Sequence, residues 1–150
     1  MASRLLIFTV VSSFLLASSY SAYATLGGDV ASVRADQQQL KASLRTIAVG
    51  RYTLFEIQTA SGTVVREYAS ASGTVFAVTW EGPSLPDLRQ ILGGYFSQVE
   101  ASSNETAATG PRVIDRPDLI FYSGGRVRAF HGKAAVPGLI PQGVSLEDIH

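Results

Sequence analysis

A five-residue motif that occurs twice constrains the fold of this chain more than any other feature. The sequence Ala-Ser-Gly-Thr-Val stands at residues 60–64 and again at 71–75. Small residues followed by glycine favour tight turns, because glycine readily adopts the positive φ that such turns need. β-rich runs flank the two copies, at 51–59, 63–69 and 74–81. The spacing predicts a three-stranded antiparallel meander with two hairpin turns.

The third predicted strand also indicates where the core lies. Phe76, Val78 and Trp80 alternate along it, which places them on one face of a strand. We therefore expect this face to be buried, with Trp80 in the core beside a helix.

A first helix is predicted before the meander. Asp29 is a suitable N-cap, and apolar residues follow at helical spacing to about Arg45, with Ile47 continuing the stripe. One interpretation is an amphipathic helix that covers the sheet. The alternative is a mobile N-terminal arm, because the stripe is narrow and Gln37 interrupts it.

A second helix is predicted after Gly82-Pro83. Ser84 is the expected N-cap, with Asp87 completing a capping box. Its apolar residues keep helical spacing: Leu85, Leu88, Ile91, Leu92, Tyr95, Phe96 and Val99. The pair Gly93-Gly94 either ends or kinks this helix or lets it approach the sheet, and the continuing stripe favours the close approach.

The remainder of the chain predicts a loop, a hairpin and a tail. Residues 101–111 are small and polar and indicate a flexible loop. Strands at 119–123 and 126–131 flank Gly124-Gly125, which we expect to form the hairpin turn. An irregular tail begins at about 134 and ends in a short turn at 145–149. The prediction is a single α+β domain with an antiparallel sheet, a three-stranded meander plus a C-terminal hairpin packed with one or two helices, in the order α-β-β-β-α-β-β.

Residues 1–24 have the pattern of a secretory signal peptide. Arg4 precedes an apolar run from Leu5 to Leu16, and Ala22-Tyr23-Ala24 matches the pattern that a signal peptidase recognises. The run is too short for a membrane span. We therefore expect cleavage after Ala24 and a periplasmic or secreted protein, residues 25–150, with no transmembrane segment.

Composition excludes several functions. The chain has no cysteine, which rules out thiol catalysis, disulfides and thiolate metal sites. It has twelve basic and twelve acidic side chains, so its overall charge gives no reason to expect nucleic acid or an anionic membrane as partner.

Four stretches of the chain resemble one known family. They are TLGGD at 25–29, SGTVVREY at 61–68, SGTVFAVTWEGP at 72–83 and PDLRQILGGYF at 86–96. Together they resemble the domain-of-unknown-function family 2844, whose members are small exported proteins of Gram-negative bacteria. The resemblance implies export but brings no activity and no catalytic residues.

Catalytic and metal-binding motifs are absent from the sequence. His131 is the one internal histidine, and Asp115 or Asp118 is the carboxylate that would orient it in a Ser-His-Asp arrangement. No G-x-S-x-G nucleophile motif and no histidine cluster accompanies them. The carboxylates Glu56, Glu67 and Glu81 lie on three different predicted strands, where exposed charges are ordinary. We therefore expect no catalytic, metal or cofactor-binding residues.

One local excess of positive charge remains. Between positions 112 and 133 the chain has five basic side chains and only two acidic ones, Asp115 and Asp118. The basic residues are Arg112, Arg116, Arg126, Arg128 and Lys133. Arg126 and Arg128 are two apart in one predicted strand, so they should share a face. This surface either contacts an anionic partner or protects a solvated edge strand against aggregation.

The sequence thus favours a non-enzymatic binding or assembly module of the cell envelope, with an envelope protein or an anionic envelope component as partner. The alternative is a cofactor-free hydrolase using His131 with Asp115 or Asp118. A third possibility is an inhibitor or assembly factor that presents a sheet edge to another chain.

Overall fold

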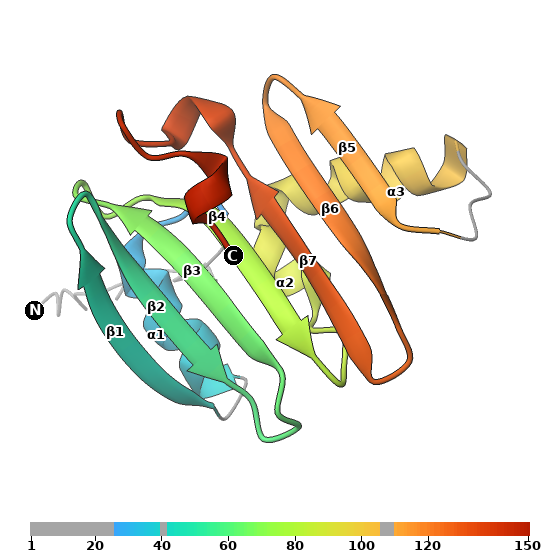
Figure 1. Cartoon of the computed structure of the whole chain (residues 1–150), viewed down its shortest axis with the longest axis horizontal. Coiled ribbons are helices and arrows are strands. Elements are labelled where there is room, and N and C mark those ends of the chain that lie inside the picture. Colours follow the sequence, from blue (N-terminus) through green and yellow to red (C-terminus); the bar gives the residue numbers. More distant parts are fainter. Residues whose placement is uncertain (1–25, 40–41, 106–109) are drawn as a thin grey trace, which may run out of the picture.

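The computed structural model describes residues 26–39, 42–105 and 110–150. The signal peptide predicted at 1–24 lies outside this range. The described strands form one antiparallel sheet in the order β1-β2-β3-β4-β7-β6-β5 (Figure 1). The strands are β1 (Ser43–Val49), β2 (Tyr52–Gln58), β3 (Val64–Ser70), β4 (Val75–Gly82), β5 (Arg112–Arg116), β6 (Leu119–Arg126) and β7 (Ala129–Ala135). The helices are α1 (Val30–Gln39), α2 (Leu88–Leu92) and α3 (Phe96–Glu105), with 3-10 turns η1 (Gly93–Tyr95), η2 (Pro137–Leu139) and η3 (Leu146–Asp148).

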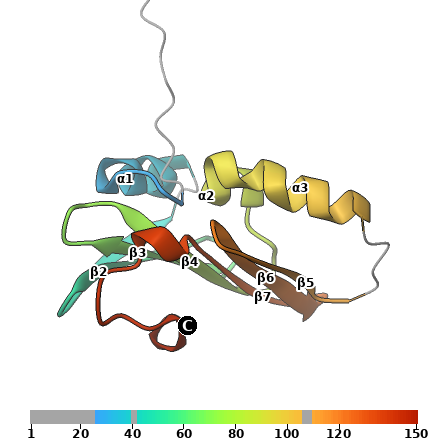
Figure 2. The same cartoon turned by 90° about the horizontal axis from the view of Figure 1, so that it is seen from above.

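The two faces of the sheet are covered differently. The three α-helices lie on one side, here called the helix face, and the segment after β7 crosses part of the other side, the tail face (Figure 2). Apolar residues fill both contacts. The larger core, on the helix face, includes Val33, Ile57, Val65, Val78, Trp80, Leu92, Val99 and Phe121. The smaller core, on the tail face, contains Tyr68, Phe76, Ala77, Ala135 and Ile149. None of the described helices has the length and apolar character needed to span a lipid bilayer.

The predicted meander is present as β2, β3 and β4. The two repeated motifs form its turns, where Gly62 and Gly73 have φ values of +89° and +87°. The predicted alternation of Phe76 with Trp80 is wrong, however. A bulge shifts the β3–β4 register, because Tyr68 pairs with Ala77 whereas Ala69 pairs with Val75. The extra residue, Phe76, therefore joins the tail-face core, while Val78 and Trp80 are buried under the helices.

The α+β class and the antiparallel sheet are confirmed, but five predicted strands become seven. The predicted helix to about Arg45 is wrong in its second half: α1 ends at Gln39, and β1 begins at Ser43 and pairs with β2. Side chains in a strand alternate between faces, so Leu44 and Ile47 do not share a stripe. The first turn agrees with the prediction, because the Ala31 amide donates to Asp29 Oδ1 at 2.7 Å. Val33 is fully buried, so α1 covers the sheet.

The second predicted helix is broken. Asp87, not Ser84, is its N-cap and accepts hydrogen bonds from the Arg89 and Gln90 amides. Gly93 then adopts φ +51°, and the chain passes through η1 before α3 begins. The expectation that both glycines allow close approach to the sheet is also wrong, because a Cβ on Gly94 would meet nothing within 4 Å.

The later elements also differ from the prediction. The loop expected at 101–111 is helical as far as Glu105, and β5 begins at Arg112. Gly124-Gly125 is not a turn but lies within β6, opposite His131 and Phe130. The β6–β7 turn falls at Val127-Arg128 instead. The tail begins after Ala135, and its expected last turn is present as η3, capped by Ser145.

Candidate functional site

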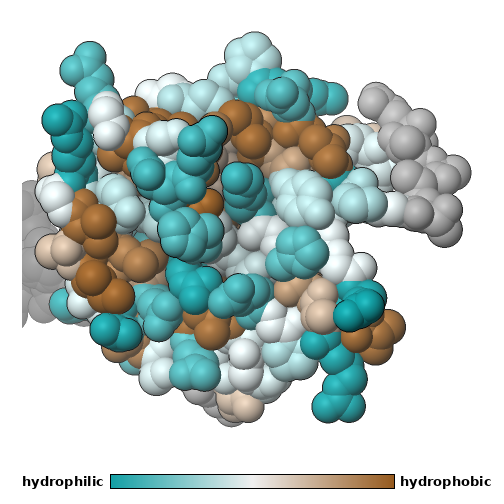
Figure 3. Space-filling view, viewed as in Figure 1, coloured by the Kyte–Doolittle hydropathy of each residue, from teal (hydrophilic) through white to brown (hydrophobic). Residues whose placement is uncertain are grey.

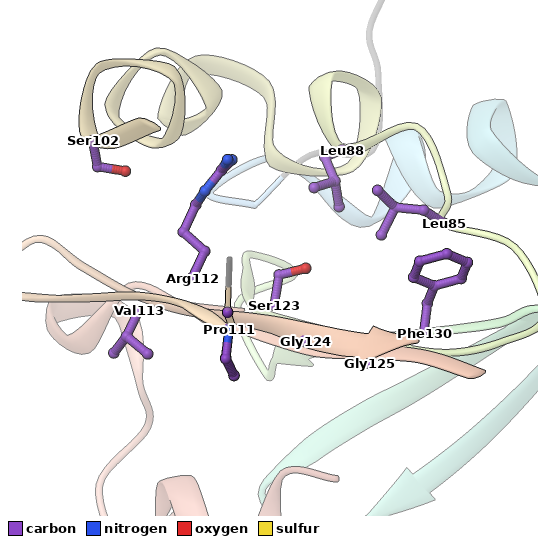
Figure 4. Close-up of a pocket in the computed structure, with 11 residues that line it drawn as sticks. Leu85, Leu88, Ser102, Pro111, Arg112, Val113, Ser123, Gly124, Gly125 and Phe130 are labelled. Atoms are coloured by element: carbon purple, nitrogen blue, oxygen red, sulfur yellow. The ribbon is translucent and has the colours of Figure 1, made fainter. Parts of the chain in front are cut away.

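A groove separates the helix layer from the β5–β6–β7 part of the sheet (Figure 4). We call it the layer groove. Its volume is about 470 Å³, which falls within the usual range for small-molecule sites. It is lined by Leu85, Leu88, Ser102, Gly110, Pro111, Arg112, Val113, Ser123, Gly124, Gly125 and Phe130.

Small side chains on β6 create this groove. Leu119 and Phe121 occupy the first helix-face positions of β6 and are fully buried. The next two positions on that face are Ser123, whose short side chain does not fill the space below the helices, and Gly125, which has no side chain. Ser102 is the residue of α3 that lines the groove from above. The space between Ser102 on the helix layer and Ser123 and Gly125 on the sheet is therefore not filled by side chains.

One end of the groove is apolar. Leu85 and Leu88 lie above Phe130 of β7, whose ring points from the sheet toward them (Figure 4). Leu85 is 46% exposed. The three side chains form an apolar wall that is open to solvent, and this wall can accept a hydrocarbon chain or ring.

Arg112 supplies the charge of the groove. It pairs with Ser123 across β5 and β6, and its side chain rises from the sheet toward the helices (Figure 4). The ion pairs among the described residues involve other side chains, so its guanidinium is available to a ligand. Arginine donates in a planar fork that fits carboxylate and phosphate groups. The groove therefore combines an anion-binding group with an apolar wall.

The tail face carries a separate polar cluster around a cavity of about 300 Å³. Arg66 donates to Glu56 at 3.0 Å and to Glu81 at 3.1 Å. Burial alone would lower the pKa of the Arg66 guanidinium, but hydrogen bonds to the two carboxylates and their charges outweigh it and raise the pKa. His131 is the register partner of Glu81 and lies 3.3 Å from the Tyr122 hydroxyl, measured at Nε2. Arg66, Glu56 and Glu81 therefore compensate one another's charges.

The structure does not bring His131 together with either predicted aspartate. Asp115 pairs with Ile120, whereas His131 lies opposite Gly124. These two partners are four residues apart on β6, about 13 Å along a strand. Asp118 accepts a hydrogen bond from Gln98 of α3 at 2.8 Å. The predicted orienting role of both carboxylates is therefore wrong.

The other carboxylates do not form a catalytic pair. Glu56 and Glu81 share Arg66, while Glu67 points to the opposite face and is only 2% exposed. The expectation that Glu67 lies on an exposed face is wrong, because α-helices cover that side of β3. No group of three or more metal-ligating side chains exists among the described residues.

The four arginines predicted to contact an anionic partner are dispersed. Arg112 lies in the layer groove, and Arg116 lies at the opposite end of β5, paired with Leu119. Arg126 ends β6, and Arg128 occupies the turn that follows. The predicted common face for Arg126 and Arg128 is therefore wrong, because they do not belong to one strand.

Sequence reasoning identified Arg112 but not its surroundings. The spacing predicts that Leu85 and Leu88 belong to a helix stripe that faces the core, but only Leu88 packs partly against that core. Ser123, Gly124 and Gly125 have the composition of a turn. These small residues form the floor of a groove because they lie on β6, beneath the helix layer that is interrupted between α2 and α3.

One family model matches the chain. It is described as "Protein of unknown function (DUF2844)" and covers residues 22–149. No curated protein and no solved structure matches.

Proposed function

The chain belongs to the DUF2844 family, and on this premise we propose that it is an exported binding protein of the cell envelope whose layer groove holds a small amphiphilic anion. The membership confirms the resemblance carried by the four sequence stretches. Because the family description contains no activity, the proposed function depends on the groove.

The observation that carries the proposal is the unpaired Arg112 opposite an apolar wall. A ligand that satisfies both ends needs a carboxylate or phosphate head and a hydrocarbon portion. A fatty carboxylate is the simplest molecule with this chemistry. The groove has no histidine and no carboxylate side chain in its lining, so its residues favour binding over acid–base catalysis.

Two observations support export. The apolar run from Leu5 to Leu16 is followed by Ala22-Tyr23-Ala24, and the family match begins at residue 22. The part of the chain that the family shares therefore begins beside the proposed cleavage site. An envelope location would also bring the protein close to lipids and their breakdown products.

Calorimetric titration with palmitate tests the proposal. The protein is expressed as the full chain and purified from the envelope in its processed form. Saturable binding of palmitate is expected, with much weaker binding of hexadecanol, which has the same chain without the charge. Arg112→Gln should weaken palmitate binding about tenfold to a hundredfold, the usual loss of a hydrogen bond to a charged group.

Arg116→Gln is the matched control. Arg116 lies on the same strand and helix face as Arg112 but outside the groove, so its replacement should leave binding unchanged. A second variant, Ser123→Leu, should fill the floor of the groove and weaken both ligands. Equal losses in the two arginine variants, or palmitate binding that survives Ser123→Leu, would contradict a ligand site in the groove.

A further inference from the structure

The β6–β7 hairpin ends in three exposed residues, Arg126, Val127 and Arg128, here called the hairpin tip. Arg126 closes the ladder opposite Ala129, and the next two residues form the turn. The hairpin extends to the lower right of the molecule (Figure 1). Hydrophobic surface lies between hydrophilic groups at that corner (Figure 3). Val127 is 84% exposed, the highest value among the large apolar residues that are exposed.

Turn formation does not explain these residues. Two-residue hairpin turns favour asparagine, aspartate and glycine, because one or both positions need positive φ. Here a β-branched valine and an arginine occupy them. Arg128 has φ +68° and is the one non-glycine residue with positive φ among those described. A bulky residue held in this conformation is a reason to look for a function at the site.

Both arginines of the tip are also unpaired. The ion pairs of the described residues are Arg66 with Glu56 and Glu81, and Arg89 with Glu100. The tip therefore presents two free guanidinium groups on either side of an exposed apolar side chain. This local charge exists although the whole chain has equal numbers of basic and acidic residues.

We propose that the hairpin tip docks the protein on an anionic phospholipid surface. The two guanidinium groups bind lipid phosphates, and Val127 enters the boundary between headgroups and acyl chains. A folded protein partner fits less well, because a stable protein interface buries about 800 Å² on each side, far more than three residues at a projecting turn offer. The proposal stands on the tip alone and does not depend on a ligand in the layer groove.

Vesicle sedimentation tests this docking. The processed protein from the envelope is mixed with sucrose-loaded vesicles of phosphatidylcholine, with and without phosphatidylglycerol. Wild-type protein should sediment with the phosphatidylglycerol vesicles only, and added salt should release it. Arg126→Ser with Arg128→Ser should weaken this binding about thirtyfold, because each arginine near the surface contributes about fivefold.

The control variant carries Arg34→Ser and Arg116→Ser. It makes the same change in net charge at two exposed positions that lie on α1 and at the far end of β5. This variant should sediment almost as wild type. Val127→Ser keeps both charges and should still weaken binding if the side chain enters the membrane. It also preserves the test if the double arginine variant does not fold.

Three results would overturn the proposal. They are wild-type protein that sediments with neither vesicle, a folded tip variant that binds as wild type, and equal losses in the tip and control variants. Because Arg112→Gln leaves the tip intact, that variant should keep vesicle binding while it binds palmitate more weakly. The two proposals can therefore fail separately.

Discussion

The indole ring of Trp80 lies directly on Gly132 of the neighbouring strand. The two residues are register partners in β4 and β7, and a Cβ placed on Gly132 would stand 2.2 Å from the indole Cζ2. Phe121 of β6 also packs against the indole, with its ring centroid 5.9 Å from that of Trp80. A missing side chain on β7 thus makes room for the largest side chain of the helix-face core.

Replacing Trp80 should test how much this contact stabilises the fold. Trp80 is 1% exposed, and truncation of a buried aromatic residue to alanine costs about 3–5 kcal/mol. We expect Trp80→Ala to lower the free energy of unfolding by this amount in urea denaturation. A loss below about 1 kcal/mol would mean that the ring contributes little to the core.

Adding a methyl group at Gly132 should also destabilise the fold, because it overfills the space that the indole of Trp80 occupies. Gly132→Ala would push a Cβ into the indole, and such overpacking costs about 1–3 kcal/mol. Trp80→Phe should relieve part of that clash, so the two changes together should cost less than the sum of the separate losses. Additive losses in a urea double-mutant cycle would show that the two sites are not coupled.

The repeated turn motif predicted the central strands correctly because its information is local. Each copy places a glycine where a tight turn needs positive φ, and that requirement does not depend on the rest of the fold. The fate of Phe76 depends on a bulge, which is set by pairing between two strands. Likewise, Gly124-Gly125 has the composition of a turn, but its pairing with β7 makes it part of a strand.

In the candidate site, too, the sequence predicts the local features but not the contacts between distant segments. The sequence alone shows the charge of Arg112 and the excess of basic over acidic residues at 112–133. The apolar wall comes from residues more than twenty positions earlier, Leu85 and Leu88, and from Phe130 on β7. Their meeting depends on the order of strands in the sheet and on the break at Gly93, neither of which a local pattern encodes.

Alkaline pH should destabilise the protein through Tyr68. This residue is buried on the tail face, and its hydroxyl donates to the His150 carbonyl at 2.7 Å. Burial raises the pKa of Tyr68 above its usual value. The unfolded chain therefore loses this proton at a lower pH than the folded chain, so the free energy of unfolding should fall as pH rises above about 10.

Tyr68→Phe isolates this effect. The variant lacks the titrating hydroxyl, so its stability should decrease less between pH 9 and pH 11 than that of the wild type, as measured by urea denaturation at each pH. Other tyrosines are present in both proteins and cancel in the comparison. Parallel curves for the two proteins would show that Tyr68 is not responsible.

The mass of the protein isolated from the envelope tests whether it is exported and processed. If the signal peptide is removed after Ala24, intact-mass spectrometry of protein from the envelope should give a chain that begins at Thr25. Replacing Ala22 and Ala24 with bulky residues should block cleavage, because the peptidase needs small side chains there. Protein that retains Met1 and stays in the cytoplasm would contradict export.

The positive φ of Arg128 can be tested by replacing the residue with glycine. A non-glycine residue in the left-handed region costs about 1–2 kcal/mol, whereas glycine adopts it freely but loses more chain entropy on folding, about 0.5–1 kcal/mol. Arg128→Gly should therefore raise the free energy of unfolding slightly, by about 0.5 kcal/mol. The same variant should bind phosphatidylglycerol vesicles more weakly, because one of the two free guanidinium groups is lost.

Arg126→Ser is the matched comparison: it removes the same charge from a residue without positive φ, so it should weaken vesicle binding without any gain in stability. If Arg128→Gly destabilises the protein in urea denaturation, the arginine is retained for the fold. If it stabilises the protein and weakens vesicle binding, the strained turn is retained for its contact with the membrane.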